Sequence, residues 1–457
     1  MNKRKYIDFK LYVSRVPDVQ ETIQVALLPT PEVGETITPV TVAFQENAIN
    51  DDLAYLASKS ITLRSLVALG KQLGNWLLPE GTIRSLFTEA RKRVGNEGGI
   101  RLRLIIADHG LKQLPWEYIY FDPMGGADSM RGFLALDPRV SIVRHEPLPR
   151  PHPHVTASGR TDLRMVMATA SPSDQPGLNM DKEVEAITGA LKDFHVGGIG
   201  IKIDSVLRDA TAPDVAAALR GAESTQLFHF AGHGITEIKT DPFTRGAERE
   251  EGFLYFIGDK TTKKAQKIPA DDLAKYLQLA GVWLVTLGAC YSGARSERNP
   301  WDSVAGALVA RDIPAVVAMQ YEIIDTQAIK FNQAFYSALA GSLSLDEAVT
   351  LGRLAIYEET SADIGKVVNV EWGVPVLYSR LPDGILVLER ETEIASQMRN
   401  VIQQTVDTIE EQGMVIGIQG SFVDGNWTVK QKAGTVSGTM IGIEKKRNDR
   451  GAARCLG

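Results

Sequence analysis

Two residues whose types suit nucleophilic catalysis each follow an apolar run of the chain. His233 lies near the end of LFHFAGHG (227–234), and Cys290 ends VWLVTLGAC (282–290). A thiol attacks a carbonyl carbon as the thiolate, so a catalytic cysteine needs a neighbouring base. Histidine supplies that base with a pKa near neutrality. The sequence therefore predicts a Cys–His pair that performs acyl transfer.

The residues beside this pair fit the same chemistry. Gly232 and Gly234 flank the histidine, and their small size permits sharp turns and the close approach of a substrate. The backbone N–H groups of Gly234 and Cys290 are candidate donors to an oxyanion. A lone cysteine or histidine at the end of a strand is more often structural. The hypothesis therefore depends on both residues reaching one site.

The segment that carries the pair alternates short apolar runs with helical patterns. Strands are expected over 163–171, 198–206, 225–234, 282–290 and 314–320, and helices over 181–194, 212–222, 269–280, 303–312 and 325–342. Nearly continuous apolar strands that alternate with helices are typical of a parallel sheet covered on both faces. Sites in such sheets form at the carboxyl ends of the strands. His233 and Cys290 both fall at such an end.

Shifts in composition divide the chain into three expected parts. Residues 1–150 form a β-rich half, and a linker rich in Pro, His, Ser and Gly follows at 147–162. The pair lies in the second part, 160–388. The third part, 390–457, is expected to hold a helix over 391–412 and short strands. It carries no chemistry of its own, so it is expected to bind a regulatory protein or to assemble subunits.

The composition excludes several classes of function. The 457 residues carry a formal net charge of −6 without a long Lys/Arg run, so a nucleic-acid partner is not expected. No apolar run approaches the roughly 18–20 residues of a membrane span, and the first residues lack the pattern of a signal peptide. Cys290 and Cys455 are the two cysteines, which fits a reducing cytoplasm. Neither a metal nor a cofactor is expected, because ligand-spaced Cys/His pairs and a P-loop are missing.

A family resemblance is carried by HFAGHG, LVTLGACYSG, LPWEYIY and VAGALVARDIPAVVAMQYEIIDTQAIKFNQAFYSAL. These stretches resemble the CHAT-domain peptidases, which are prokaryotic relatives of caspases and separases. The resemblance covers about residues 6–380. It implies an α/β fold with a mostly parallel, caspase-like sheet and helices on both faces. A degenerate pseudo-protease half would precede this sheet, and a small helix-plus-β module would follow it.

The resemblance also implies a function. It makes His233 the catalytic histidine, Cys290 the nucleophile, and Gly234 and Cys290 the oxyanion donors of a cysteine endopeptidase. The expected substrate is a protein, encoded by a neighbouring gene, in regulated prokaryotic (antiviral) defence or cell death. Two alternatives remain open: a catalytically silent caspase-like scaffold for protein binding, and a thiol hydrolase that acts on small esters or amides.

One position bears on specificity. Related peptidases that cut after Arg or Lys carry an Asp two residues before the cysteine, where this chain has Gly288. A neutral or apolar residue is therefore expected before the scissile bond. Other expected pocket residues are Asp174, Asp181, Trp301 and Asp325.

Two further expectations concern local structure. The charged insert at 234–252 follows the histidine directly and is expected to be a solvated loop, with a substrate-gating lid or self-processing loop as the alternative. Trp116 and Trp372 are expected to be anchors of the core.

Overall fold

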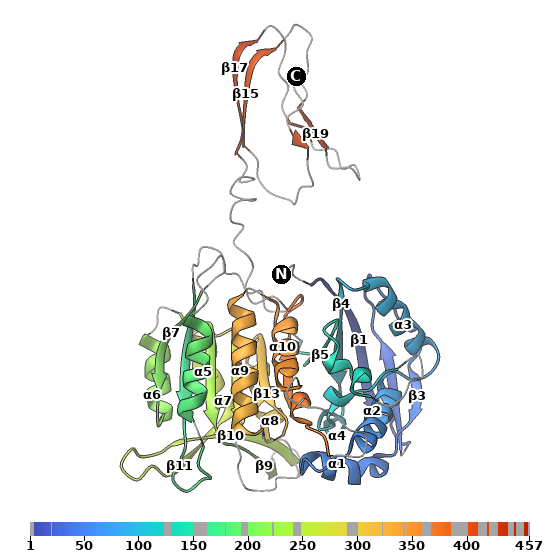
Figure 1. Ribbon diagram of the computed structural model, residues 1–457, viewed down its shortest axis with the longest axis vertical. Helices are drawn as coiled ribbons and strands as arrows, with labels where there is room; N and C mark the ends of the chain where they lie inside the picture. Colours follow the sequence, from blue (N-terminus) through green and yellow to red (C-terminus); the bar gives the residue numbers. More distant parts are fainter. Residues whose placement is uncertain are drawn as a thin grey trace. The chain divides into compact units, whose positions relative to one another are not determined.

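An 11-stranded sheet is the frame of the computed structural model (Figure 1). In order across the sheet, its strands are β3 (Val40–Ala43), β2 (Thr22–Leu27), β1 (Tyr6–Arg15), β4 (Gly99–Ile106), β5 (Val140–Arg144), β14 (Pro375–Ser379), β13 (Ala315–Met319), β12 (Leu284–Ala289), β8 (Leu227–Gly232), β6 (Asp162–Thr169) and β7 (Gly200–Leu207). The neighbours from β13 to β7 pair in parallel, as do β1 with β4 and β4 with β5. The pairs β1–β2, β2–β3 and β13–β14 are antiparallel. The expected mostly parallel α/β sheet is confirmed.

The structure describes most of the first 384 residues and short segments after them. The described residues are 4–19, 21–122, 129–149, 151, 162–178, 180–192, 200–221, 224–240, 248–289, 300–321, 323–341, 343–357, 367–384, 401–409, 418–419, 428–436, 443–444 and 452–455. Cys290 and most of the predicted linker at 147–162 lie outside them.

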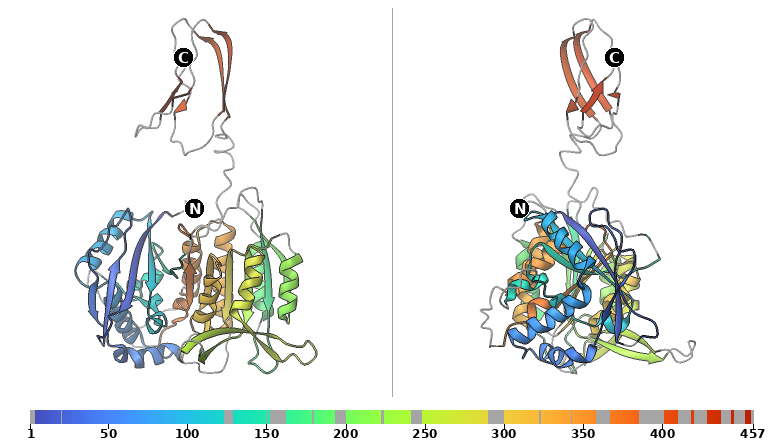
Figure 2. Two further views of the ribbon diagram at one scale, coloured as in Figure 1. Left: turned by 180° about the vertical axis from the view of Figure 1, so that it is seen from behind. Right: turned by 90° about the vertical axis from the view of Figure 1, so that its right-hand side faces the viewer.

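Helices cover both faces of the sheet. They are α1 (Asn50–Ala57), α2 (Leu63–Leu77), α3 (Thr82–Val94), α4 (His109–Lys112), α5 (Met180–Lys192), α6 (Ala212–Gly221), α7 (Ala270–Leu279), α8 (Pro300–Ala310), α9 (Asp325–Ala340) and α10 (Leu345–Tyr357). In the sheet, β7 lies on one side of β6, and β8, β12 and β13 follow in order on the other side. The chain therefore moves in one direction from β6 to β7 and in the opposite direction from β7 to β8, β12 and β13. Right-handed crossovers therefore put α5 on one face and α6, α7 and α8 on the other. The helix α9 packs against both α5 and α10, and Figure 2 shows the same sheet from behind.

Local sequence explains where elements begin and how deeply they are buried. Thr62 caps α2 by accepting a hydrogen bond from the Ser65 N–H at 3.3 Å, and Asp108 caps α4 by accepting one from the Leu111 N–H at 2.9 Å. Every residue of β8 is buried, because helices cover both of its faces. This double coverage explains why the strand is apolar on both sides, with His229 as its polar exception.

A buried ion pair fixes the contact between the N-terminal strands and the rest of the sheet. Glu117 is fully buried, and its carboxylate receives Arg144 Nε at 3.1 Å and Arg144 Nη2 at 2.7 Å. Arg144 Nη2 also donates to Gln320 Oε1 at 3.1 Å, directly after β13. Trp116 and Trp372 are both buried, which confirms them as core residues.

Residues 1–156 and 160–387 form one compact unit, and residues 157–159 with 388–457 form a second. The described strands of the second unit are β15 (Val401–Ile409), β16 (Ile418–Gln419), β17 (Thr428–Val436), β18 (Ile443–Glu444) and β19 (Ala452–Cys455). Parallel pairing joins β15 to β17, and β19 pairs antiparallel with both β16 and β18. The three-part division proposed from the sequence stays a prediction.

Two expectations about secondary structure are wrong. The helix expected over 391–412 is replaced by β15 at 401–409, while 391–400 and 410–412 lie outside the described residues. Val, Ile and Thr make up most of that strand, and their branched side chains favour extended backbone over helix. The solvated loop expected at 234–252 is largely a hairpin of β9 (Gly234–Thr240) and β10 (Glu248–Ile257). Its charges pair across the strands, as Lys239 does with Glu251.

No described helix combines the length and the apolar composition that a membrane crossing needs.

Removing the charge of Glu117 tests the junction around Arg144. We expect Glu117→Gln to lower the free energy of unfolding by about 3–5 kcal/mol, because the guanidinium stays buried without its counter-ion. Urea unfolding followed by tryptophan fluorescence measures the loss. The matched control is Asp181→Asn, which removes an exposed ion pair with Arg208 and should cost less than about 1 kcal/mol. Equal losses in the two variants would contradict this role for Glu117.

Candidate active site

The pairing of β8 with β12 sets the geometry of the site. The two strands are parallel neighbours, with Thr286 opposite His229, Gly288 opposite Ala231, and Ala289 opposite Gly232. Partners in a parallel pair point to the same face of the sheet, and side chains alternate along each strand. His229 and Ala231 therefore share a face with Thr286 and Gly288. The ring of His233, directly after β8, bonds to Pro176 in the segment that leads to α5, which covers this face through Glu183 and His229. The next residue after Ala289 is Cys290, which lies outside the described residues.

A hydrogen bond of its ring orients His233. Its Nε2 atom lies 2.9 Å from the carbonyl oxygen of Pro176, in the segment that follows β6. A carbonyl only accepts, so Nε2 carries a proton and donates it. The buried Nδ1 atom has no hydrogen-bond partner among the described residues. Nδ1 of the neutral ring is therefore the nitrogen with a lone pair able to accept a proton.

Burial sets the acidity of this ring. Desolvation lowers the pKa of His233 below its ordinary value, and the hydrogen bond to Pro176 offsets part of that effect. The neutral imidazole is thus favoured, which keeps the proton-accepting form available. Pro176 is a positioning residue that sequence analysis missed, because its backbone carbonyl leaves no signature in the side-chain pattern.

The chain around His233 depends on close backbone approach. A Cβ atom at Gly232 would lie 2.6 Å from Phe230 Cζ and 3.2 Å from the carbonyl oxygen of Ala170. Tyr255 N–H donates to the His233 carbonyl at 2.9 Å, while Gly234 lies opposite Leu254. This pattern makes Gly234 and Leu254 a non-hydrogen-bonded pair of the antiparallel ladder. The N–H of Gly234 therefore points away from β10.

The hairpin that follows His233 is anchored to its surroundings. Thr236 Oγ1 donates to Ser303 Oγ of α8 at 3.3 Å, and Ser303 Oγ donates to Glu250 Oε2 at 3.2 Å. Glu250 Oε1 lies 2.9 Å from Nε2 of His109, at the start of α4. A third strand, β11 (Ala265–Pro269), pairs with β10. The described part of the insert is thus a fixed small sheet beside the histidine.

A buried polar cluster lies on the same face of the sheet as His233. Glu183 of α5 accepts hydrogen bonds at Oε1 from Asn332 Nδ2 at 2.8 Å and from His229 Nε2 at 3.1 Å. The other ring nitrogen of His229 lies 3.0 Å from the Tyr336 hydroxyl of α9. Nothing in the sequence pattern brings α5 and α9 to this histidine.

The expected pocket residues have varied surroundings. Asp174 accepts a hydrogen bond from the Ala265 N–H at 2.9 Å, so it holds the segment after β6 against β11. Asp181 is exposed and pairs with Arg208 at 3.0 Å. Asp325 begins α9. Trp301 lies in α8, and its side chain is outside the described residues. A role of these four residues in a substrate pocket stays a prediction.

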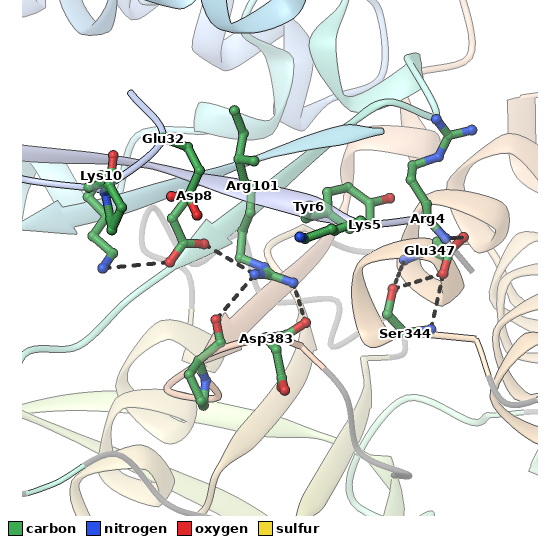
Figure 3. Close-up of a pocket in the computed structure, with 14 residues that line it drawn as sticks. Arg4, Lys5, Tyr6, Asp8, Lys10, Glu32, Arg101, Ser344, Glu347 and Asp383 are labelled. Carbon is green, nitrogen blue, oxygen red and sulfur yellow. Dashed lines mark hydrogen bonds and ion pairs between the residues drawn. The ribbon is translucent and has the colours of Figure 1, made fainter. Parts of the chain in front are cut away.

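A separate pocket lies beside β1 and the start of β4 (Figure 3). Arg101 lines it and donates from Nη1 to Asp8 Oδ1 at 3.1 Å and to the Pro382 carbonyl at 3.3 Å. Its Nη2 atom lies 2.5 Å from Asp346 Oδ2 of α10. The guanidinium therefore ties the chain after β14 to β4. Among the described residues, no group of three or more His, Cys, Asp or Glu side chains could hold a metal ion.

Comparison with known protein families finds a match over most of the chain. A family model described as CHAT domain matches residues 67–401. No curated protein sequence matches the chain.

Several solved structures are similar to the chain. The Arg-specific cysteine proteinase gingipain R (RGPB) is 13% identical, with 76% of each chain covered and a TM-score of 0.38. The Saccharomyces cerevisiae separase–securin complex is 14% identical over 65% of this chain and 17% of that chain, with a TM-score of 0.34. The Drosophila initiator caspase Dronc is 8% identical over 53% of this chain and 97% of that chain, with a TM-score of 0.27.

The protonation of His233 gives a direct test of its environment. We expect its ring signal, followed by NMR in histidine-labelled protein and assigned with His233→Gln, to titrate below about 6.5, the ordinary value for histidine. The folded state then binds fewer protons than the unfolded state, so the stability contributed by the neutral ring is lost as pH falls through the lowered pKa. Histidine in the same protein unfolded in urea is the reference. A midpoint above that reference would contradict the assignment.

Proposed function

The chain belongs to the CHAT domain family, and we propose that it is a cysteine endopeptidase whose catalytic pair is His233 and Cys290. The observation that carries the proposal is the register of β8 and β12, in which Ala289 lies opposite Gly232. Neighbouring strands lie about 4.8 Å apart, and consecutive Cα atoms are about 3.8 Å apart. In the sequence, Cys290 comes directly after Ala289 and His233 comes directly after Gly232, so the proposed nucleophile and its base each follow one member of this pair.

The first half of the proposed reaction forms an acyl-enzyme. His233 Nδ1 takes the proton of the Cys290 thiol, and the sulfur attacks the carbonyl carbon of the scissile peptide bond. The carbonyl oxygen becomes an oxyanion that accepts hydrogen bonds from the N–H groups of Gly234 and Cys290. The C–N bond then breaks, and the imidazolium gives its proton to the leaving amine. A thioester on Cys290 and a new amino terminus result.

The second half releases the other product. A water molecule gives one proton to His233 and attacks the thioester carbon. The C–S bond breaks, the imidazolium returns the proton to the sulfur, and a carboxylic acid leaves. The hydrogen bond from His233 Nε2 to the Pro176 carbonyl is compatible with each step, because that nitrogen keeps its proton throughout. Pro176 also stabilises the imidazolium that forms twice in the cycle.

The proposed setting follows from the family. We propose a protein substrate, encoded by a neighbouring gene, that is cut in the cytoplasm during prokaryotic defence or cell death. A protease of this kind needs restraint, and the unit formed by residues 388–457 is the proposed site for a regulatory partner or for self-assembly.

Replacing each member of the pair tests the catalytic proposal. We expect Cys290→Ala to abolish cleavage of proteins encoded beside the gene, and His233→Ala to slow it about a thousandfold or more, because the thiol loses its base. Mass spectrometry of the products after incubation measures both effects. Cys455→Ser is the matched control, since Cys455 lies in β19 of the second unit, and it should cleave like the wild type. Full activity of Cys290→Ala would contradict the proposal, and a wild type that binds these proteins without cutting them would favour a silent scaffold.

A chain that ends at residue 387 separates catalysis from regulation. The sheet, its helices and the Glu117–Arg144 junction all lie before that residue, so we expect the shortened chain to fold and to keep its peptidase activity. Loss of residues 388–457 should change oligomeric mass or response to a partner instead. Light scattering and cleavage rates, compared with the full chain, measure the two effects. A shortened chain that unfolds would contradict this division.

A further inference from the structure

Gly288 leaves an open position on the face of the sheet that carries His233. Side chains alternate along β12, so residue 288 shares its face with Thr286, and the proposed nucleophile comes two residues later in the sequence. Gly288 lies opposite Ala231, two residues before His233. A group that fills the space in front of Gly288 would therefore border the bond to be cut.

A carboxylate occupies that space. A Cβ atom at Gly288 would lie 2.9 Å from Oε1 of Glu183, which reaches it from α5. The side chain of Glu183 is nearly buried, and its Oε1 atom is held by Asn332 and His229. Gly288 leaves β12 without an acidic side chain at this position, and Glu183 of the helix α5, packed on the same face, provides a carboxylate there.

Hydrogen bonds connect this carboxylate to His229 and Asn332 and, through His229, to Tyr336. Burial raises the pKa of Tyr336, so its hydroxyl keeps its proton and can donate to the nearer ring nitrogen of His229. Nε2 of His229 faces Glu183 from the other side of the ring, and Asn332 donates to the same carboxylate oxygen. Among the described residues, no Lys or Arg forms an ion pair with Glu183, which contacts His229 and Asn332 instead.

A buried carboxylate that no described Lys or Arg pairs with favours a cation brought by a ligand. We propose that Glu183 determines specificity, and that the site accepts a basic side chain, Arg or Lys, at the residue before the scissile bond. This inference rests on the proposed peptidase function. It replaces the expectation of a neutral or apolar residue, which depended on Gly288 alone. Gly288 fits the new role, because a larger residue would fill the route to the carboxylate.

Peptide substrates that differ at one residue test the inference. The full-length protein is assayed on fluorogenic peptides, identical except that Arg, Lys, Leu, Ala or Glu precedes the aminocoumarin leaving group. We expect kcat/KM for Arg or Lys to exceed that for Leu by about tenfold or more. Glu183→Gln keeps the shape of the side chain and should lower cleavage after Arg and Lys about thirtyfold, with cleavage after Leu unchanged.

Three further variants separate specificity from structure. Glu185→Gln removes an exposed carboxylate from the same helix and should behave like the wild type. Glu183→Asp keeps the charge and should keep the preference for basic residues, although at a lower rate. Gly288→Ala places a methyl group against the Glu183 carboxylate and should reduce cleavage after Arg and Lys more than after Leu.

The outcomes distinguish this inference from the proposed function. A wild type that prefers Leu or Ala and is unaffected by Glu183→Gln overturns the inference and leaves the peptidase intact. Equal loss on all peptides in Glu183→Gln, with an unchanged melting temperature, overturns it as well, because the carboxylate would then only support the strand. A wild type that cleaves no peptide, like Cys290→Ala, contradicts the peptidase function itself.

Discussion

The parallel pairing of β8 with β12 is the constraint on which the site depends. Backbone hydrogen bonds fix Ala289 opposite Gly232, so the chain continues from both strands at one edge of the sheet. A shift of one residue in this register would place His229 and Thr286 on opposite faces of the sheet. Helices on both faces prevent such a shift, because every residue of β8 is buried.

The same burial that fixes the register also sets the chemistry. A buried histidine is disfavoured as a cation, and this effect keeps the ring of His233 neutral while Pro176 orients it. On the same side of the sheet, hydrogen bonds join Glu183, His229, Asn332 and Tyr336 and tie α5 and α9 to β8. His233 and the buried carboxylate are thus parts of one polar layer, held in place by an otherwise apolar sheet.

Sequence predicted the sheet well because its signals are local. Apolar runs such as 227–232 and 284–287 are long enough to mark buried strands, and helices alternate with them. Family membership was likewise visible in stretches such as HFAGHG, and the family match confirms it. Beyond residue 400 the local signal failed, because VIQQTVDTI in β15 follows a segment with helical spacing. The hairpin after His233 was missed because its many charged residues hide the alternation of its strands.

The site was predictable only in part, because its partners come from distant segments. His233 was identified from its own flanking glycines, whereas Pro176 contributes a backbone carbonyl, which no side-chain pattern reveals. Glu183 reaches Gly288 across more than a hundred residues of chain, through the packing of α5 on the sheet. Sequence spacing does not encode that contact. The proposed preference for a basic residue depends on this contact, which the residues of the strand alone do not reveal.

The central claim is that His233 acts on the thiol of Cys290. The rate at which iodoacetamide alkylates Cys290 at pH 7, followed by mass spectrometry of the peptide that contains it, measures this directly in the wild type and in His233→Ala. We expect the wild type to react about tenfold faster or more, because the imidazole removes the thiol proton. Equal rates in the two proteins would contradict it.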